Sequence, residues 1–214
     1  MRVVITCGPS CEPIDGVRRL TNFSTGELGL LLAAELSRAG HEVVCLKGDG
    51  AVSRVDPGGA RVVSFSTNAD LLARLRDIGA GGADAVFHAA ALCDYAVKDV
   101  RDGDGSPVTA KKIPTLAGEV TLTLRPALKL LPSLRAIFPA AKIVGWKYEL
   151  NGTPDDAEAR AREQISANGT QACVVNGAAW GGGFGFIEPG REVIHLAGKP
   201  TLCAFLAEWL RAGK

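Results

Sequence analysis

The sequence predicts a three-layer α/β domain in which a mostly parallel, Rossmann-like sheet carries helices on both faces. Short apolar runs alternate along the chain with amphipathic segments of helical periodicity, as in strands joined by crossover helices. The apolar runs contain few polar residues, which is typical of strands covered on both faces. The chain has 214 residues, of which 47% are hydrophobic, and this size suits one core. We expect a single domain over residues 1–214 with a projecting flap or dimerisation arm at about 96–126.

The first half of the chain supplies four expected strands. Gly8-Pro9 ends the first apolar run and Gly40 precedes the second, because Gly and Pro interrupt regular structure. A polar loop through residues 12–19 leads to the first helix, for which Ser24 or Thr25 is the expected cap. The expected strands cover 2–6, 42–46, 61–65 and 85–91; the helices cover about 24–38, with Leu28, Leu31, Leu32 and Leu36 turned inward, and 68–78.

Residues 96–126 interrupt this alternation. They contain a charged, glycine-bearing segment, the pair Lys111-Lys112 and an alternating, half-exposed strand at 120–124. Such insertions often serve as lids or dimer contacts. The α/β pattern then resumes, with helices expected at 128–137, 155–167 and 199–210 and strands at 142–146, 172–175 and 192–196. The Gly-rich segment 181–185 is either a lid or a loose connection.

Charge and cysteine usage exclude several classes of function. The formal net charge of +1 gives no electrostatic reason to expect a nucleic-acid or membrane partner. The spacing of Cys7 and Cys11 is not that of a redox or zinc motif. The three histidines are widely separated, so we expect no structural metal, and His88 is expected to be a packed histidine. No apolar run approaches the length of a membrane span, and we expect a soluble, cytoplasmic protein.

The segment 21–29 is the main candidate for a ligand site. Its pattern Ser24-x-Gly26-x-x-Gly29 resembles a dinucleotide fingerprint whose first glycine is replaced, although such a pattern can also mean only a tight helix entrance. Bare glycines at a helix N-terminus let a phosphate approach the backbone N–H groups. In parallel sheets, ligands bind at the carboxyl ends of the strands. Gly8, residues 24–29 and residues 90–94 are expected to meet along that edge.

Hydride transfer is disfavoured by the spacing of this segment. Roughly fifteen residues separate Thr6 from the Gly-rich turn, whereas the dinucleotide motif places the turn directly after the first strand. The second strand ends in Leu46-Lys47 rather than in an acidic residue that could bind ribose. The P-loop spacing and a nucleophile elbow are missing from the sequence. A phosphate-binding helix N-terminus, an asparagine, an aspartate and mobile lysines remain, and these groups suit activation of a carboxylate by a nucleotide.

Several blocks together resemble the phosphopantothenoylcysteine synthetase (phosphopantothenate–cysteine ligase) family of coenzyme A biosynthesis. The likeness runs from Arg2 to about Leu210. The matching blocks, in the family's order, are Asn22-Phe-Ser-Thr-Gly26 with Gly29, Ala90-Ala-Leu-Cys-Asp-Tyr95, Lys112-Ile113, Ile143-Val-Gly-Trp-Lys-Tyr-Glu149 and Val174-Val-Asn176.

The resemblance implies a ligase that uses a nucleoside triphosphate, ATP or CTP, with Mg²⁺. In the family, 4′-phosphopantothenate is converted to an acyl-nucleotidylate with release of pyrophosphate, and the amine of L-cysteine then displaces the nucleoside monophosphate. Asn22 and Lys112 are the implied catalytic residues. The implied substrate-binding residues are Asn22, Ala90, Ala91 and Asp94, and the implied nucleotide-binding residues are Gly8, Ser10, Ser24, Gly26, Gly29, Trp146 and Asn176.

The sequence also departs from the family pattern. The family's Gly-Gly-Thr after the first strand is Gly8-Pro9-Ser10 here, which removes a backbone donor, and Pro114 stands where a further lysine is expected. The segment 145–149 looks closer to the stand-alone, ATP-using members, and no flavin-dependent decarboxylase domain is expected upstream. A homodimer is expected. Two alternatives stay open: a catalytically silent nucleotide-binding homologue and an NADP-binding reductase.

Overall fold

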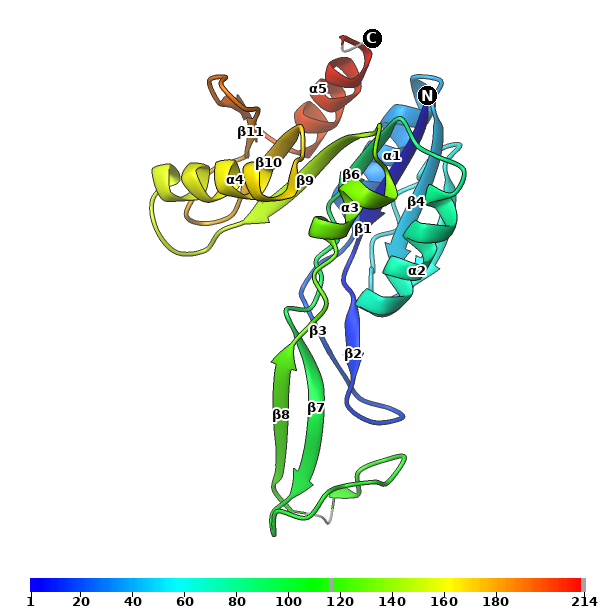
Figure 1. Ribbon diagram of the computed structural model, residues 1–214, viewed down its shortest axis with the longest axis vertical. Coiled ribbons are helices and arrows are strands. Elements are labelled where there is room, and N and C mark those ends of the chain that lie inside the picture. The colour runs from blue at the N-terminus through cyan, green and yellow to red at the C-terminus, as the bar shows by residue number, and fades with distance from the viewer. Residues whose placement is uncertain (116–117, 213–214) are drawn as a thin grey trace.

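The computed structural model describes residues 1–115 and 118–212, and an eight-stranded mixed sheet forms its centre (Figure 1). The strand order is β12-β11-β10-β9-β6-β1-β4-β5. Six strands are parallel, and β11 and β12 are antiparallel at one edge. The bounds are β1 (Arg2–Cys7), β4 (Glu42–Gly48), β5 (Arg61–Phe65), β6 (Ala85–His88), β9 (Lys142–Tyr148), β10 (Ala172–Asn176), β11 (Phe184–Ile187) and β12 (Ile194–Leu196).

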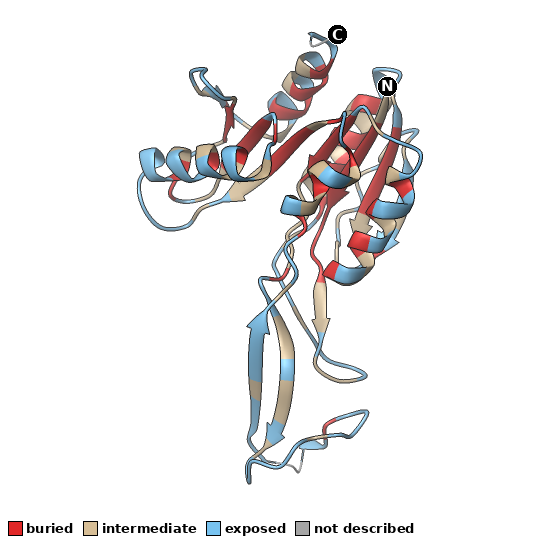
Figure 2. Ribbon diagram, viewed as in Figure 1, coloured by how far each residue is buried: buried red, intermediate tan, exposed pale blue. Residues whose placement is uncertain are grey.

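Helices cover both faces of this sheet, which confirms the expected fold class. On one face, α1 (Glu27–Arg38) and α5 (Lys199–Ala212) pack with Val3 and Ile5 of β1. On the other face, α2 (Asn68–Gly79) and α3 (Leu131–Ile137) pack with Val4, which lies between Val3 and Ile5 in β1. Successive strand residues point to opposite faces, so a strand buried on both sides must be apolar throughout. A third cluster joins α4 (Pro154–Asn168) to β10 and β11, and the buried strands are visible in Figure 2.

A two-stranded antiparallel arm projects from the sheet edge at which β1 and β6 end (Figure 1). It is built from β7 (Tyr95–Asp102) and β8 (Val120–Pro126). Beside it lies a short hairpin of β2 (Cys11–Pro13) and β3 (Arg19–Thr21). The sequence analysis predicted the arm but not the hairpin, because the polar residues 12–19 carry no apolar alternation that would mark a strand.

The start of the first helix differs from the expectation. Neither Ser24 nor Thr25 is the N-cap: the helix begins at Glu27, and Gly26 occupies the N-cap position with φ 75° and no side-chain capping bond. The left-handed conformation favours glycine, so the backbone turn replaces a capping hydroxyl. Leu30 is fully packed in the core, whereas Leu28 and Leu31 are only half-buried against it.

Other boundaries also shift. The fourth strand ends at His88 rather than at residue 91, although Ala91 still forms an isolated bridge to Pro9. The helix expected from residue 128 begins at Leu131, where Pro132 occupies the first turn, a position that tolerates a missing N–H. The segment 181–185 is not wholly a loop, because β11 begins at Phe184. No helix in the described part of the chain is long and apolar enough to cross a membrane.

Candidate functional site

The candidate site lies where β1 and β6 end side by side. In the strand order, β4 lies on one side of β1 and β6 lies on the other, so the order reverses at β1. Such a switch point opens a crevice at the carboxyl ends of the two strands. The peptide N–H of Ala91 donates to the carbonyl oxygen of Gly8 at 2.9 Å, and that of Ser10 donates to the carbonyl oxygen of Ala91 at 3.2 Å. The segments after the two strands therefore form one continuous edge.

Glycine contacts bring the start of α1 onto the end of β1. A Cβ atom on Gly26 would lie 3.5 Å from the Cα of Gly8 and 2.9 Å from the Cβ of Ala51. Both glycines have positive φ angles, 76° at Gly8 and 75° at Gly26. Side chains at either position would therefore meet neighbouring atoms and strain the backbone. Both glycines are buried, and their missing side chains let the start of α1 pack closely against the end of β1 and against Ala51.

The N-terminus of α1 has the properties of an anion site. No side chain caps it, although Thr25 Oγ1 accepts a weak bond from the N–H of Glu27 at 3.3 Å. Uncapped N–H groups and the helix dipole both favour negative charge. Gly29 lies one turn further in and is buried, and a Cβ there would stand 2.2 Å from the Cβ of Cys7. Gly29 therefore permits close helix–strand packing.

Asn22 lies on the loop between β3 and α1 and is fixed by its amide. Its Nδ2 donates to the carbonyl oxygen of Leu92 at 2.8 Å and approaches that of Ala91 at 3.5 Å. Ser10 is fully buried, and its Oγ accepts a bond from the peptide N–H of Cys93 at 2.8 Å. Ser10 thus holds the segment after β6, while Asn22 lines its exposed side.

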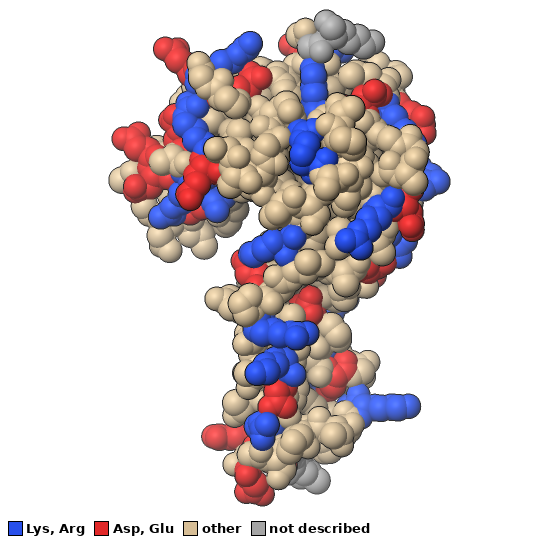
Figure 3. Space-filling view, viewed as in Figure 1, with Lys and Arg blue, Asp and Glu red and all other residues tan. Residues whose placement is uncertain are grey.

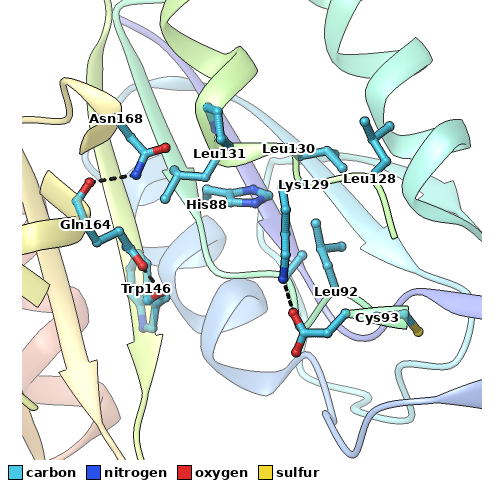
Figure 4. A pocket seen from close by; sticks show the side chains of 13 residues that line it. His88, Leu92, Cys93, Leu128, Lys129, Leu130, Leu131, Trp146, Gln164 and Asn168 are labelled. Carbon is cyan, nitrogen blue, oxygen red and sulfur yellow. Dashed lines mark hydrogen bonds and ion pairs between the residues drawn. The ribbon is translucent and has the colours of Figure 1, made fainter. Parts of the chain in front are cut away.

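A cleft of about 280 Å³ opens on the far side of that segment, between α3 and α4 (Figure 4). Its floor includes His88, and its mouth carries an ion pair between Asp94 and Lys129. Apolar side chains dominate the wall beneath α3. The lining residues are His88, Ala90, Leu92, Cys93, Asp94, Leu128, Lys129, Leu130, Leu131, Pro132, Trp146, Gln164 and Asn168.

His88 presents a neutral ring to this cleft. Its Nδ1 lies 2.8 Å from Thr6 Oγ1, which also accepts a bond from the peptide N–H of Ala90 at 3.3 Å. The Thr6 hydroxyl can donate to Nδ1 or accept from it, so the contact suits either tautomer of the neutral ring. Burial lowers the pKa of His88 to about 4, so the ring is uncharged at neutral pH. The sequence analysis expected only a packed histidine here.

Sequence reasoning missed Lys129, Gln164 and Asn168 as lining residues. Lys129 precedes α3, and its ammonium group pairs with the Asp94 carboxylate. Gln164 and Asn168 lie one turn apart on α4 and both line the cleft. Gln164 fits there because Gly145 of β9 has no side chain. A Cβ at Gly145 would stand 2.5 Å from Gln164 Nε2. The available signal in the sequence was the four-residue spacing of these two amides, which places them on the same face of a helix.

Trp146 lies inside β9, two residues before its end, and Asn176 is the last residue of β10. Trp146 lines the cleft, with its carbonyl oxygen near Gln164 Nε2 at 3.4 Å, and its indole packs with the core cluster on the α1 face. The indole Nε1 is buried and has no hydrogen-bond partner. Asn176 pairs in register with Tyr148, and its carbonyl oxygen accepts a bond from the N–H of Glu149 at 2.9 Å.

Lys112 does not join the other predicted residues. It is exposed and belongs to the segment between β7 and β8, at the end of the arm remote from the sheet (Figure 1). Lys and Arg side chains interleave with acidic ones along the arm (Figure 3). Within one chain, therefore, the structure brings together Gly8, Ser10, Asn22, Gly26, Ala90, Ala91 and Asp94, and leaves Lys112 apart.

The crevice between β1 and β6 and the uncapped N-terminus of α1 are features of a doubly wound α/β domain. Residues 1–200 match the DNA/pantothenate metabolism flavoprotein C-terminal domain, and the chain belongs to this family. It is 32% identical over 185 residues to the coenzyme A biosynthesis bifunctional protein CoaBC of Bacillus subtilis, covering 86% of this chain and 42% of that protein. The chain thus spans about two fifths of the length of the curated relatives it matches.

Two solved structures share the fold. The DNA/pantothenate metabolism flavoprotein from Streptococcus pneumoniae superposes with a TM-score of 0.87 at 22% identity, with full coverage of both chains. A Cab2 mutant in complex with phosphopantothenate-cysteine superposes with a TM-score of 0.75 at 17% identity, covering 99% of this chain and 85% of that chain.

Proposed function

We propose that this protein is a phosphopantothenate–cysteine ligase that acts in coenzyme A biosynthesis. The observation that carries the proposal is the uncapped N-terminus of α1 against Gly8, beside Asn22 and the segment 90–94. This arrangement offers a phosphate-binding surface within reach of a side-chain amide. The family membership and the Cab2 complex with phosphopantothenate-cysteine support the choice of substrates.

The nucleoside triphosphate would lie along the α1 face of the crevice. Gly8 and Gly26 hold the start of α1 against the end of β1, and the first-turn N–H groups of the helix would donate to phosphate oxygens. The indole of Trp146 packs on the same sheet face, and Asn176 stands one strand further on. We favour ATP over CTP because segment 145–149 resembles the stand-alone ATP users. Mg²⁺ would neutralise phosphate charge and enter with the nucleotide.

In the first step, an oxygen of the 4′-phosphopantothenate carboxylate attacks the α-phosphorus and pyrophosphate leaves. The side chain of Asn22 is held by Leu92 and can orient the acyl group without competing as a nucleophile. Ala90, Ala91 and Asp94 would hold the pantothenate arm. In the second step, the cysteine amine attacks the acyl carbon, an amide bond forms and the nucleoside monophosphate leaves. Lys112 would stabilise phosphate charge during the reaction.

A homodimer is part of the proposal. Exposed apolar side chains gather on and beside the arm: Val17 is 64% exposed, Phe23 is fully exposed and Tyr95 is 57% exposed. A two-stranded ribbon is rarely stable alone, and exposed apolar side chains of this size favour a partner surface. A second copy of the chain would cover them.

The direct test measures pyrophosphate release with 4′-phosphopantothenate, L-cysteine and Mg²⁺, supplying ATP and CTP in separate reactions. We expect release that depends on phosphopantothenate and is faster with ATP. Product formation should require cysteine, whereas a single turnover of pyrophosphate release should not. Absence of release with both nucleotides would refute the ligase and favour a silent nucleotide-binding homologue.

A further inference from the structure

A buried carboxylate connects the β2–β3 hairpin to the segment that carries Lys112. The side chain of Asp15, in the hairpin turn, is only 2% exposed. Its Oδ1 accepts bonds from the peptide N–H groups of Val17 at 2.8 Å and Arg18 at 2.7 Å. Its Oδ2 accepts a bond from the peptide N–H of Ile113 at 3.1 Å and pairs with the Arg18 guanidinium at 2.6 Å. Two bonds thus fold the turn, and one reaches across 98 positions of sequence.

Gly16 and Arg18 add contacts to the same segment. The peptide N–H of Gly16 donates to the carbonyl oxygen of Lys111 at 2.7 Å. Arg18 Nη1 donates to the carbonyl oxygen of Ile113 at 3.2 Å. The side chain of Ile113 is buried, with 6% exposure. The hairpin turn and the arm segment therefore dock by backbone bonds and one apolar anchor.

These bonds bracket Lys112. The residue before it is held through its carbonyl oxygen, and the residue after it is held through both its N–H and its carbonyl oxygen. The backbone of Lys112 is consequently fixed while its own side chain remains exposed. No ion pair engages Lys112 within residues 1–115 and 118–212. Its ammonium group is free to meet an anionic ligand.

The electrostatics favour a charged Asp15 in this contact. Hydrogen bonds from the Val17 and Ile113 N–H groups hold the pKa of Asp15 down at about 2. A carboxylate accepts four hydrogen bonds here, and a neutral amide could not accept them all. Removing the charge should therefore release the arm segment.

We propose that Asp15, with Gly16 and Arg18, is the positioning element that fixes Lys112 for nucleotide chemistry. This inference rests on the proposed ligase function and adds a residue that touches neither substrate nor nucleotide. Asp15 acts through Lys112, which alone would contact phosphate. We therefore expect Asp15 to affect the rate of acyl-nucleotidylate formation and not the binding of the nucleotide at α1.

Two variants separate docking from chemistry. Asp15→Asn keeps the shape of the side chain and removes its charge. Gly16→Ala leaves every polar group in place, but the added Cβ would stand 2.7 Å from the carbonyl oxygen of Lys111. Gly16 does not have a positive φ angle, so alanine fits the backbone and only the docked segment is displaced. Gly103→Ala is the matched control on the arm, since its nearest atom would be 3.8 Å away.

Hydrogen exchange at the Ile113 amide measures docking without reference to activity. We expect slow exchange in the wild type and Gly103→Ala, and faster exchange in Asp15→Asn and Gly16→Ala. In the pyrophosphate assay, kcat should fall by about 10²-fold in both docking variants, since small misplacements can cost that much. KM for the nucleotide should stay unchanged.

The outcomes separate this inference from the ligase proposal. Unchanged exchange at Ile113 in both folded variants would overturn the docking contact. Faster exchange with an unchanged kcat, or a raised KM with an unchanged kcat, would overturn the positioning role. If the wild-type chain releases no pyrophosphate, the ligase proposal fails, and exchange then reports on the contact alone. Thermal unfolding identifies a variant that does not fold, and Gly16→Ala is the milder of the two.

Discussion

Asn22 makes a hydrogen bond that requires a side-chain donor. Its Nδ2 lies 2.8 Å from the carbonyl oxygen of Leu92, and a carboxylate at that place would face the oxygen with another acceptor. The added negative charge would also oppose phosphate at the start of α1. We expect Asn22→Asp to lower the rate of acyl-nucleotidylate formation by about 10²-fold, measured as single-turnover pyrophosphate release. A rate equal to that of the wild type, in a variant with unchanged thermal stability, would remove Asn22 from the catalytic residues.

The neutral state of His88 has a consequence for stability. Burial lowers its pKa to about 4 in the folded chain, while an unfolded histidine titrates near 6.5. The unfolded chain therefore binds more protons between these values, and stability falls as the pH drops from about 6.5 towards 4. The loss would reach about 3 kcal/mol at the low end.

Urea unfolding at pH 7 and at pH 4.5 measures this loss. Other groups titrate in the same range, so the informative quantity is the difference between the wild type and His88→Gln, which can still accept a bond from Thr6. We expect the wild type to lose more free energy of unfolding than the variant. Equal losses would mean that His88 is not the group responsible.

At the scale of single elements, the contact between α1 and β1 decides how closely the helix N-terminus approaches the sheet edge. Gly29 faces Cys7, and a Cβ there would lie 2.2 Å from the Cβ of Cys7. Gly29→Ala gains about 0.5–1 kcal/mol of helix propensity but forces the helix off the strand, which costs about 1–3 kcal/mol. We expect a net loss of about 1–2 kcal/mol in urea unfolding and weaker nucleotide binding.

Gly59→Ala provides the matched control for that substitution. Its added Cβ would lie 3.9 Å from Ser37 Cβ, an ordinary contact, and its stability should change by no more than about 0.5 kcal/mol. A Gly29→Ala variant as stable as this control, with unchanged nucleotide affinity, would show that α1 tolerates displacement.

For the whole molecule, the sequence predicted the layered fold well because burial on both faces leaves a strong pattern. Short apolar runs such as 43–46 indicate strands buried on both faces, and this run lies in β4, between β1 and β5. The predicted boundaries of helices and strands were wrong where backbone geometry, and not hydrophobic pattern, sets the end of an element. Gly26 takes the N-cap position that was expected for Ser24 or Thr25. Its left-handed conformation favours glycine, and a glycine in the sequence does not by itself mark a helix start.

The candidate site was predictable in part. Gly8, residues 24–29 and residues 90–94 were expected to meet, and in the structure Gly8 contacts both Gly26 and Ala91. Asn22 adds a hydrogen bond to the carbonyl oxygen of Leu92. Contacts between residues far apart in the chain could not be predicted, because they leave no pattern in the local sequence. Examples are the bond from the Ile113 N–H to Asp15 and the ion pair of Lys129 with Asp94. Asp15 and Lys129 look like ordinary surface charges in the sequence, because their partners depend on the tertiary fold.

The separation of Lys112 from the sheet edge leads to a prediction about the assembly. Within one chain, the segment between β7 and β8 lies at the end of the arm (Figure 1), while the bare N-terminus of α1 lies at the sheet. If the arm keeps this position while Lys112 acts on bound phosphate, a second copy of the chain presents the lysine. We therefore expect a homodimer, measured as twice the monomer mass by light scattering, with each Lys112 serving the other chain's α1 site.

Mixing two inactive variants tests this arrangement. In a dimer of one Asn22→Asp chain and one Lys112→Ala chain, one site would carry both defects and the other would carry neither. Random exchange of subunits should then restore about a quarter of wild-type activity, because half of the dimers are mixed and each has one intact site. Asn22→Asp mixed with the double variant should restore none, since no site escapes a defect. If the first mixture also stays inactive while mixed dimers form, Lys112 serves the site of its own chain, and the arm must then move towards the sheet during catalysis.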